Sequence, residues 1–326
     1  MAIQFGKANV NTSQSTCKVA IVGAGYMSRE HIRAFQDVPR VEIVGIHSRT
    51  RSRAEALAQE FRLPNVCGSI SELFERTAAD LVIVSVPELS VNAICCACFE
   101  HPWTVLVEKP AGYDVADAEA IESAARAKHR WAYVALNRRH YGSTRAVVAD
   151  LATLAGPRLI KVQDQENPVA ALQAGQPRLV VENWMYANSI HVIDYFSFLG
   201  RGKITAVEPV IRWDPRHPRY VVARISFDSG DVGLYEAIWD GPGPWAVSVN
   251  TPEKRWEMRP LEKASYQLSG KRVLESIEDD AWDIRFKPGL RRQAELAVLA
   301  ASGQRTELPT LQDALTSMRL TQAIYA

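Results

Sequence analysis

In the first 137 residues, the hydrophobic positions follow two alternating patterns. Short and nearly continuous apolar runs, such as 81–84 and 104–107, are typical of strands covered on both faces of a parallel sheet. Between these runs, apolar residues recur every three or four positions, which is the period of a helix. The predicted strands are 18–22, 41–46, 81–86, 104–108 and 132–137, and the predicted helices lie near 27–37, 51–61, 69–77, 89–101 and 114–129. This alternation predicts an α/β fold with a doubly wound parallel sheet.

The pattern changes after residue 138. A predicted helix near 142–154 and a strand near 158–164 lead into a polar stretch, 165–183, in which we expect no regular structure. A helix near 185–199 follows. Further strands are predicted near 204–213, 219–228, 231–240, 245–251 and 254–260, and helices near 288–302 and 310–325 close the chain. Consecutive strands joined by short turns predict a large open sheet, mixed or antiparallel, in an α+β domain.

Two glycines follow the first predicted strand. Gly23 allows a tight turn off that strand, and Gly25 lets backbone N–H groups approach a pyrophosphate at the N-terminus of the next helix. Ser28 stands where the third glycine of the G-x-G-x-x-G motif would be. The spacing of strand, turn and helix predicts a Rossmann dinucleotide site, in which we expect Tyr26 and Met27 to contact the cofactor as well.

The length of 326 residues is sufficient for two domains. We expect a dinucleotide-binding domain at 17–137 and a substrate-binding domain at 138–326. Residues 1–16 are polar and have no apolar core of the kind found in signal peptides, so they are predicted to form a disordered or extended tail.

Composition narrows the function further. A formal net charge of +1 gives no overall field that would attract nucleic acid or a membrane surface, and no apolar run approaches the ~20 residues that span a bilayer. The five cysteines and the absence of secretory features favour a reducing, cytoplasmic setting. Cys95 and Cys98 form a C-x-x-C pair inside a helical pattern. We interpret them as buried packing residues, because no second pair completes a metal site.

The choice of cofactor depends on the end of the second predicted strand. An NAD site usually offers an acidic residue there for the ribose 2′-hydroxyl, and here no acid occurs before Glu55. Ser48, Arg49 and Arg53 could instead bind the 2′-phosphate of NADP. The alternative is that the arginines are solvated and that Arg49 stacks on adenine. The missing acid favours NADP, and NAD remains the second choice.

A lysine ends the fifth predicted strand, in the sequence Glu108-Lys109-Pro110. The carboxyl ends of parallel strands are where open α/β sheets bind ligands. Lys109 could therefore lie beside a nicotinamide and donate to a substrate oxygen. Pro87, after the preceding strand, is expected to shape the loop under the nicotinamide ribose, and Glu108 is expected to belong to the cofactor site.

These features together resemble the Gfo/Idh/MocA family of oxidoreductases. The resemblance covers most of residues 18–326, and it rests on the glycine turn, His31, the Glu108-Lys109-Pro110 tripeptide, and His191 with Asp194. It implies a nicotinamide-binding fold joined to an open mixed sheet and the interconversion of a carbinol and a carbonyl, usually on a sugar or cyclitol. It also implies homo-oligomers that assemble through the C-terminal sheet.

The resemblance assigns His191 as the group that exchanges the alcohol proton, beside Lys109 as the second catalytic residue. Many family members carry an Asp four residues before this histidine, and here that position is Ala187. Helical spacing places Trp184, Asn188, His191 and Tyr195 on one face. The residues expected to bind substrate are Arg138, Tyr186, Asn188 and Asp194.

The sequence leaves several hypotheses open. The first is an NAD(P)-dependent dehydrogenase of a sugar, a sugar derivative or a cyclitol, with a small polyol or sugar as its substrate and no metal, nucleic acid or membrane partner. The same chemistry could act on a non-sugar cyclic diol. A dinucleotide-binding regulator without turnover is the alternative that Ala187 favours, whereas the presence of both Lys109 and His191 opposes it.

Overall fold

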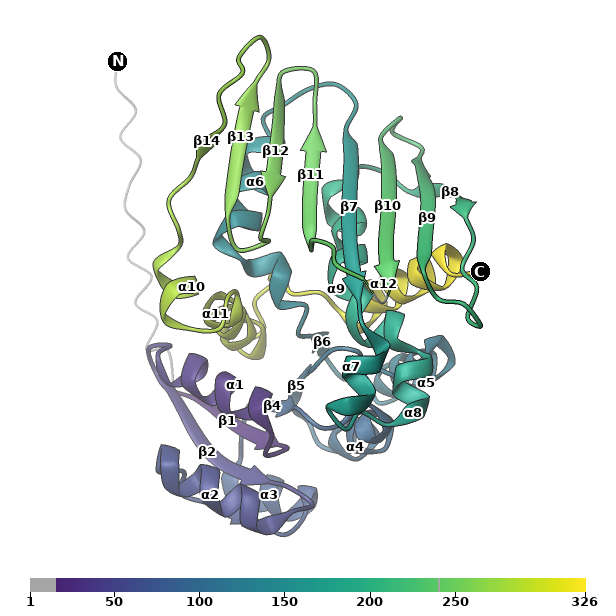
Figure 1. Ribbon diagram of the computed structural model, residues 1–326. Helices are drawn as coiled ribbons and strands as arrows, with labels where there is room; N and C mark the ends of the chain where they lie inside the picture. The colour runs from purple at the N-terminus through teal and green to yellow at the C-terminus, as the bar shows by residue number, and fades with distance from the viewer. Residues whose placement is uncertain (1–15, 240) are drawn as a thin grey trace, which may run out of the picture.

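The computed structural model describes residues 16–239 and 241–326 (Figure 1). Nearly all of the tail predicted at 1–16 therefore lies outside the described residues. The first half of the chain forms a six-stranded sheet in the order β3-β2-β1-β4-β5-β6, and all neighbouring strands are parallel. Its strands are β1 (Cys17–Val22), β2 (Val41–His47), β3 (Val66–Cys67), β4 (Leu81–Val84), β5 (Thr104–Val107) and β6 (Ala132–Val134). This order is that of a Rossmann fold, so the predicted doubly wound sheet is confirmed.

Five helices connect these strands: α1 (Tyr26–Gln36), α2 (Arg51–Phe61), α3 (Ile70–Thr77), α4 (Val91–Phe99) and α5 (Val115–Ala127). Local side chains fix where two of them begin. Ser69 accepts a hydrogen bond from the N–H of Glu72 at 3.0 Å, and Asp114 accepts one from the N–H of Asp117 at 2.8 Å. Each bond satisfies a backbone donor that a helix N-terminus would otherwise leave free. Cys95 and Cys98 lie on the buried face of α4, as predicted.

The second half forms an eight-stranded sheet in the order β14-β13-β12-β11-β7-β10-β9-β8. Only the pair β7–β10 is parallel among the described pairs, so the sheet is mixed, as predicted. Its strands are β7 (Leu159–Glu166), β8 (Ile204–Ile211), β9 (Tyr220–Phe227), β10 (Val232–Trp239), β11 (Ala246–Asn250), β12 (Lys254–Met258), β13 (Ala264–Leu268) and β14 (Glu275–Ser276).

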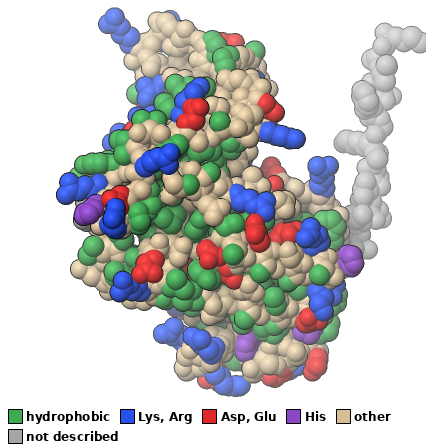
Figure 2. All heavy atoms as spheres, turned by 90° about the vertical axis from the view of Figure 1, so that its right-hand side faces the viewer, with side chains coloured by type: hydrophobic (Ala, Val, Ile, Leu, Met, Phe, Trp, Pro, Cys, Tyr) green, Lys and Arg blue, Asp and Glu red, His purple; other side chains and the backbone are tan. Residues whose placement is uncertain are grey.

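Helices cover one face of this second sheet, and its other face is open (Figure 1). The covering helices are α6 (Gly142–Leu151), α9 (Ile190–Leu199) and α12 (Leu311–Ile324), and all three contact strands of the sheet. Every second residue of β7, β9 and β10 is buried under them, which is the two-residue period of a half-covered sheet. Figure 2 shows charged side chains of both signs scattered among hydrophobic ones on the side of the molecule that it presents.

Three parts of the sequence-based prediction need correction. Residues 165–183 are not irregular, because they contain α7 (Pro168–Gln173) and α8 (Arg178–Glu182). Asn167 caps α7, and Pro168 occupies its first position, where a missing N–H costs nothing. The strands β13 and β14 and the two-residue strand β3 were not predicted, because their short or polar sequences give no clear period. The predicted helix 185–199 begins with a π-helical turn, η3 (Met185–Ser189), ahead of α9.

The last part of the chain returns to the first sheet. Helix α11 (Leu290–Ala301) packs against α1, β4 and β5, and its residues Leu290, Ala294 and Ala297 join the hydrophobic cluster around β1. The predicted boundary at residue 138 stays a prediction. In the folded chain, however, α11 belongs by its contacts to the dinucleotide-binding side. Among the described residues, no helix has both the length and the apolar composition needed to cross a bilayer.

A buried ion pair fixes the junction between the two halves. Arg139, in the short helix η2 (Asn137–His140), donates to both carboxylate oxygens of Asp194 on α9, each at 2.7 Å. Ser317 of α12 donates to the same carboxylate at 2.6 Å. Asp194 is only 2% exposed, so its carboxylate is fully engaged inside the protein.

We expect the variant Asp194→Ala to lower the free energy of unfolding by about 3–5 kcal/mol, because it leaves the Arg139 charge buried without a partner. Urea unfolding followed by circular dichroism measures this change. The control is Glu208→Ala, which removes a pair with Arg224 whose side chains are about half exposed, and its effect should stay below about 1 kcal/mol. Equal effects of the two variants would contradict the structural role of Asp194.

Candidate active site

The turn after β1 has the geometry of a pyrophosphate site. Gly23 has φ +117°, and a Cβ atom at this position would lie 1.9 Å from the carbonyl oxygen of Ser85. No side chain fits there. A Cβ at Gly25 would meet nothing within 4 Å, so this backbone faces open space that a ligand can enter. Ser28, at the position of the third glycine, is buried and accepts the N–H of Gly25 at 3.3 Å.

The two glycines therefore make a matched pair of variants. Gly23→Ala should fail to fold or lose several degrees of Tm, because the clash and the left-handed backbone act in the protein without ligand. Gly25→Ala should keep its Tm and weaken cofactor binding, because the added methyl group occupies space that only a ligand fills. Thermal unfolding and fluorescence titration with nicotinamide cofactors measure the two effects. The same loss of Tm in both variants would contradict this distinction.

The predicted 2′-site lies where β2 ends. Ser48 follows β2 and accepts the N–H of Thr50 at 3.3 Å, and the N-terminus of α2 begins at Arg51. Arg49 and Arg53 are exposed. Glu55, the first acid after β2, accepts a hydrogen bond from Arg51 at 2.8 Å. The end of β2 thus presents a hydroxyl group, guanidinium groups and a helix N-terminus, a set that suits a phosphate.

Lys109 leaves the end of β5 and crosses to the second half of the chain. Its ammonium donates to the carbonyl oxygen of Ala187, in η3, at 2.7 Å. Burial, with a smaller contribution from Arg138, lowers the pKa of Lys109 to about 8, against the opposite effects of Glu108, Glu88 and Glu166. Lys109 is therefore mostly an ammonium at neutral pH and can lose its proton slightly above it.

Glu108 precedes Lys109 at the end of β5 and contacts α1. Its carboxylate is 8% exposed and lies 2.6 Å from Nε2 of His31 on α1, and it also accepts the N–H of Lys109 at 3.2 Å. These contacts tie the end of β5 to the first helix of the dinucleotide-binding domain. Glu108 thus fixes the backbone from which Lys109 projects, and its expected place in the cofactor site stays a prediction.

The turn η3 is held by a carboxyl group at the end of β7. Glu166 is 1% exposed and accepts hydrogen bonds from Trp184 at 2.7 Å, Asn188 at 2.8 Å and Ser189 at 3.0 Å. The sequence-based prediction missed this residue because it placed 165–183 in an irregular stretch. The alternation of buried residues along β7, which puts Asp164 and Glu166 on the covered face, is the signal that could have revealed it.

His191 follows this turn and lies within the influence of three cations. Burial lowers the pKa of His191 well below its usual value, and Arg138, Lys109 and Lys287 lower it further. The imidazole is therefore neutral at physiological pH and can accept a proton. Its ring lies 6.2 Å from that of Trp245. Lys287 was not predicted, and its ammonium lies 5.6 Å from the ring of Tyr26, beside the turn of glycines.

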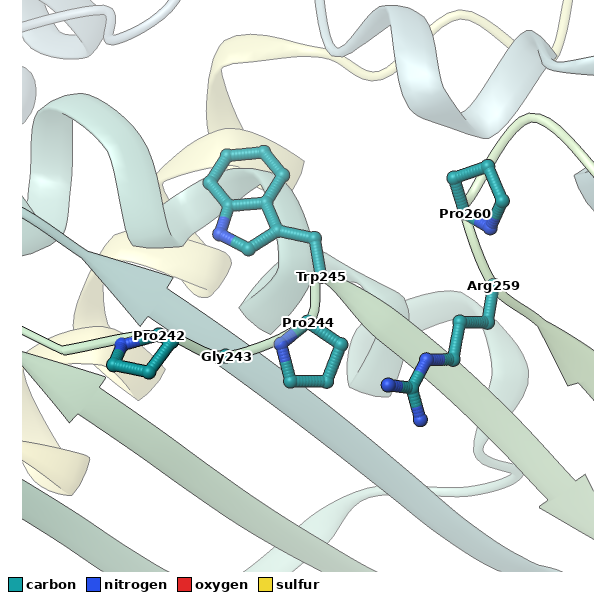
Figure 3. A pocket seen from close by; sticks show the side chains of 6 residues that line it. All are labelled: Pro242, Gly243, Pro244, Trp245, Arg259 and Pro260. Atoms are coloured by element: carbon teal, nitrogen blue, oxygen red, sulfur yellow. The ribbon is translucent and has the colours of Figure 1, made fainter.

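Trp245 lies at the start of β11 and connects His191 to a pocket of about 620 Å³. Pro242, Gly243, Pro244, Trp245, Arg259 and Pro260 line this pocket (Figure 3). The guanidinium of Arg138 lies 4.6 Å from the centre of the Trp245 ring, and its charge acts on His191. Its expected role in substrate binding stays a prediction. The indole donates to the carbonyl of Gln165 at 2.9 Å and so holds the ring in place.

The structure also shows where the other residues predicted for the site lie. Asn188 points to Glu166, and Tyr186 is buried, which raises the pKa of its phenol and keeps it neutral. Tyr195 is buried and bonded to Thr144 at 2.9 Å, so the single polar face predicted for 184–195 is wrong. The π-helical turn changes the spacing and turns Trp184 and Asn188 toward β7. Tyr26 and Pro87 are exposed and Met27 is half-buried.

The structure thus brings the two predicted catalytic side chains to one site. Lys109 bonds to a carbonyl one turn before His191, and its charge acts on the His191 imidazole. Lys109 follows the carboxyl end of β5, and the turn of glycines follows the carboxyl end of β1 in the same sheet. Among residues 16–239 and 241–326, no three His, Cys, Asp or Glu side chains gather as potential metal ligands. Fold and glycine turn together indicate a dinucleotide-binding protein, with a candidate active site where Lys109 approaches the helix of His191.

Comparison with known proteins gives a family match over part of the chain. Residues 17–136 match the family described as "Oxidoreductase family, NAD-binding Rossmann fold", GFO_IDH_MocA. The match covers the dinucleotide-binding half of the chain, and the curated relatives found over this and neighbouring residues are named dehydrogenases.

Three relatives illustrate how far the likeness extends. The chain is 24% identical over 236 residues to 4-carboxy-2-hydroxymuconate-6-semialdehyde dehydrogenase of Sphingobium sp., which covers 70% of this chain and 73% of that protein. It is 26% identical to human trans-1,2-dihydrobenzene-1,2-diol dehydrogenase over 45% of each protein. The crystal structure of a dehydrogenase from Chromobacterium violaceum superposes with a TM-score of 0.81 at 18% identity, covering 96% of this chain and 95% of that one, which shows the same fold.

Proposed function

We propose that the protein is an NADP-preferring dehydrogenase that oxidises one CH–OH group of a sugar, a sugar derivative or a cyclitol. One observation carries this proposal: the Lys109 ammonium, bonded at 2.7 Å to the carbonyl of Ala187, lies one helical turn from a neutral His191. An ammonium and a neutral imidazole are the two groups that an alcohol needs as it becomes a carbonyl.

Lys109 and His191 have different roles in the reaction. In the oxidation, the C–H electron pair leaves as a hydride, the O–H bond breaks, and the C–O single bond becomes a double bond. His191 accepts the hydroxyl proton, and Lys109 stabilises the negative charge that develops on oxygen. The bound nicotinamide supplies the hydride acceptor, and the turn at Gly23 and Gly25 would hold its pyrophosphate. In the reverse reaction the protonated imidazole returns the proton.

The preference for NADP rests on the end of β2, where Ser48, Arg49 and Arg53 meet the N-terminus of α2 and Glu55 is paired with Arg51. We expect kcat/KM to be higher with NADP than with NAD. Arg49→Gln should reduce kcat/KM for NADP by about 10-fold, since a charge-assisted bond to phosphate contributes roughly 1.5–3 kcal/mol. The value for NAD should change little. An equal loss with both cofactors would favour stacking of Arg49 on adenine.

A cyclic diol that is not a sugar is the second candidate substrate. The Trp245 ring beside His191 supports it, because indole binds both the apolar face of a sugar and a flat carbocycle. The name of the human relative also supports it. Absorbance at 340 nm, followed with panels of sugars, cyclitols and cyclic diols and with both cofactors, tests the proposal. Tight cofactor binding without turnover on any of the three panels would favour a regulator instead.

We further propose that a second copy of the chain covers the open face of the C-terminal sheet. The ion pairs Lys161–Glu236, at 3.2 Å, and Arg224–Glu208, at 2.9 Å, lie across neighbouring strands of this sheet. The edge strand β8 exposes 66% of Val210. Light scattering on the purified protein should give a mass of at least two chains, and a mass of one chain would contradict this arrangement.

A further inference from the structure

The buried carboxyl group of Glu166 ties both ends of the turn 184–189 to strand β7. Its oxygen Oε2 accepts Trp184 Nε1 at 2.7 Å and Asn188 Nδ2 at 2.8 Å, and its Oε1 accepts Ser189 Oγ at 3.0 Å. Three donors from one turn therefore converge on one side chain. A turn held at its first and last residues by the same carboxyl group has little freedom to shift.

Ala187 lies inside this turn and provides the only hydrogen bond described for the Lys109 ammonium, through its carbonyl oxygen. Its methyl side chain cannot reach Lys109 by a polar contact. The place of the ammonium therefore depends on the backbone of the turn, and the turn depends on Glu166. The charge of Glu166 also acts on Lys109, together with Glu108, Glu88 and Arg138.

We propose that Glu166, at the end of strand β7, is a positioning residue of the active site. It acts by fixing the carbonyl that receives the Lys109 ammonium and the start of the helix that carries His191. This inference rests on the proposed dehydrogenase function.

The surroundings of Glu166 show that a contribution to fold stability does not explain why a carboxyl group is buried at this position. Asp164 lies two residues earlier on the same covered face, and Tyr235 donates to its Oδ2 at 2.7 Å. The other oxygen of Asp164 is buried with no donor among the described residues, so a proton shared with Glu166 would satisfy it. Burial raises the pKa of both carboxyl groups, which is the behaviour of a pair that holds one proton. Burying two carboxyl groups lowers the free energy of unfolding, and apolar residues at these positions would give a more stable fold.

Two substitutions of Glu166 test whether its hydrogen bonds to the turn position Lys109. One keeps these bonds and the other removes them. In Glu166→Gln, the amide oxygen can accept from Trp184 and Asn188, and the amide nitrogen can donate to Ser189 Oγ and to the unpaired oxygen of Asp164. In Glu166→Leu, all of these bonds are lost at similar volume. Glu75→Leu, at an exposed position of α3 outside the site, is the control for the loss of a carboxylate. Ser189→Ala removes one of the three bonds and serves as a milder variant.

The first readout does not need a substrate. Acetylation of Lys109 by acetic anhydride at a series of pH values, measured by peptide mass spectrometry, gives the pKa of Lys109. Glu166→Leu should lower this pKa by roughly one unit, because the ammonium loses both its acceptor and a nearby carboxyl group. Glu166→Gln should keep most of the wild-type value. A complete absence of turnover in the wild type would overturn the proposed function and leave this measurement intact.

The second readout is turnover at 340 nm with a substrate found in the panels. Glu166→Leu should lose about 100-fold in kcat, the usual effect of moving a catalytic group by about 1 Å, with KM changed much less. Glu166→Gln should stay within a few-fold of the wild type. Wild-type kcat and Lys109 pKa in folded Glu166→Leu would overturn the proposal. If that variant does not fold, Ser189→Ala decides: lower kcat at unchanged Tm supports the proposal, and unchanged kcat overturns it.

Discussion

Replacing Lys109 with methionine lowers kcat by about 10²–10³-fold, because the ammonium that stabilises the developing negative charge is gone. Fluorescence titration should show cofactor binding close to that of the wild type, since the turn of glycines and the end of β2 are untouched. Turnover at 340 nm measures the loss. The matched control is Lys271→Met, an exposed lysine outside the site, which should leave kcat unchanged.

The same variant should not lose stability. The pKa of Lys109 falls from 10.5 to about 8 on folding because the side chain is buried. Between these values the unfolded chain binds more protons than the folded one, so stability rises with pH in this window and the charged lysine opposes folding below it. At pH 7, Lys109→Met should therefore have a Tm equal to or above the wild-type value. A large fall in Tm together with lost activity would mean that Lys109 supports the fold.

Replacing His191 with asparagine should lower kcat by about 10²–10⁴-fold in the oxidation, because the proton acceptor is removed. The neutral amide keeps a similar size in the buried site, so Tm should change little. Stopped-flow measurement of the first turnover at 340 nm separates this loss from slow product release. The control is His217→Asn, an exposed histidine paired with Asp214, which should behave as the wild type.

The dependence of the oxidation rate on pH tests the protonation states of His191 and Lys109. His191 stays neutral well below pH 6.5 because burial and the three nearby cations oppose its protonation. Oxidation should thus keep its rate on the acidic side, where a histidine of ordinary pKa would lose its function as a base. The rate should fall as the pH rises through about 8, where Lys109 loses its proton. A rate that falls with an apparent pKa of 6.5 on the acidic side would contradict a neutral buried His191.

The sequence was sufficient for the dinucleotide-binding half, except for the two-residue strand β3, because the signals of its other elements are local. Continuous apolar strands, capped helices and the glycine turn each follow from a few neighbouring residues, and the strand order of a Rossmann fold follows from right-handed connections. Lys109 could be placed by the same reasoning, because the end of a parallel strand is already a ligand-binding position. Resemblance to the family, rather than any pattern of spacing, identified His191.

The rest of the site depends on contacts between distant parts of the chain. The π-helical turn adds to the helical repeat before His191, so a 3.6-residue period placed Tyr195 in the site and hid the bonds from Trp184 and Asn188 to Glu166. Asp194 has the residue type of a substrate ligand, yet it is paired with Arg139, 55 positions earlier in the chain. The return of α11 to the first sheet has no signal in its own sequence.

A crystal structure of the protein with NADP tests the central claim most directly. The account predicts that the pyrophosphate lies on the turn at Gly23 and Gly25 and that the nicotinamide ring lies beside both Lys109 and His191. The space next to atom C4 of the nicotinamide ring should let one substrate C–O group reach both side chains at hydrogen-bond distance, about 3 Å. A nicotinamide bound where no single C–O group could touch Lys109 and His191 together would contradict it.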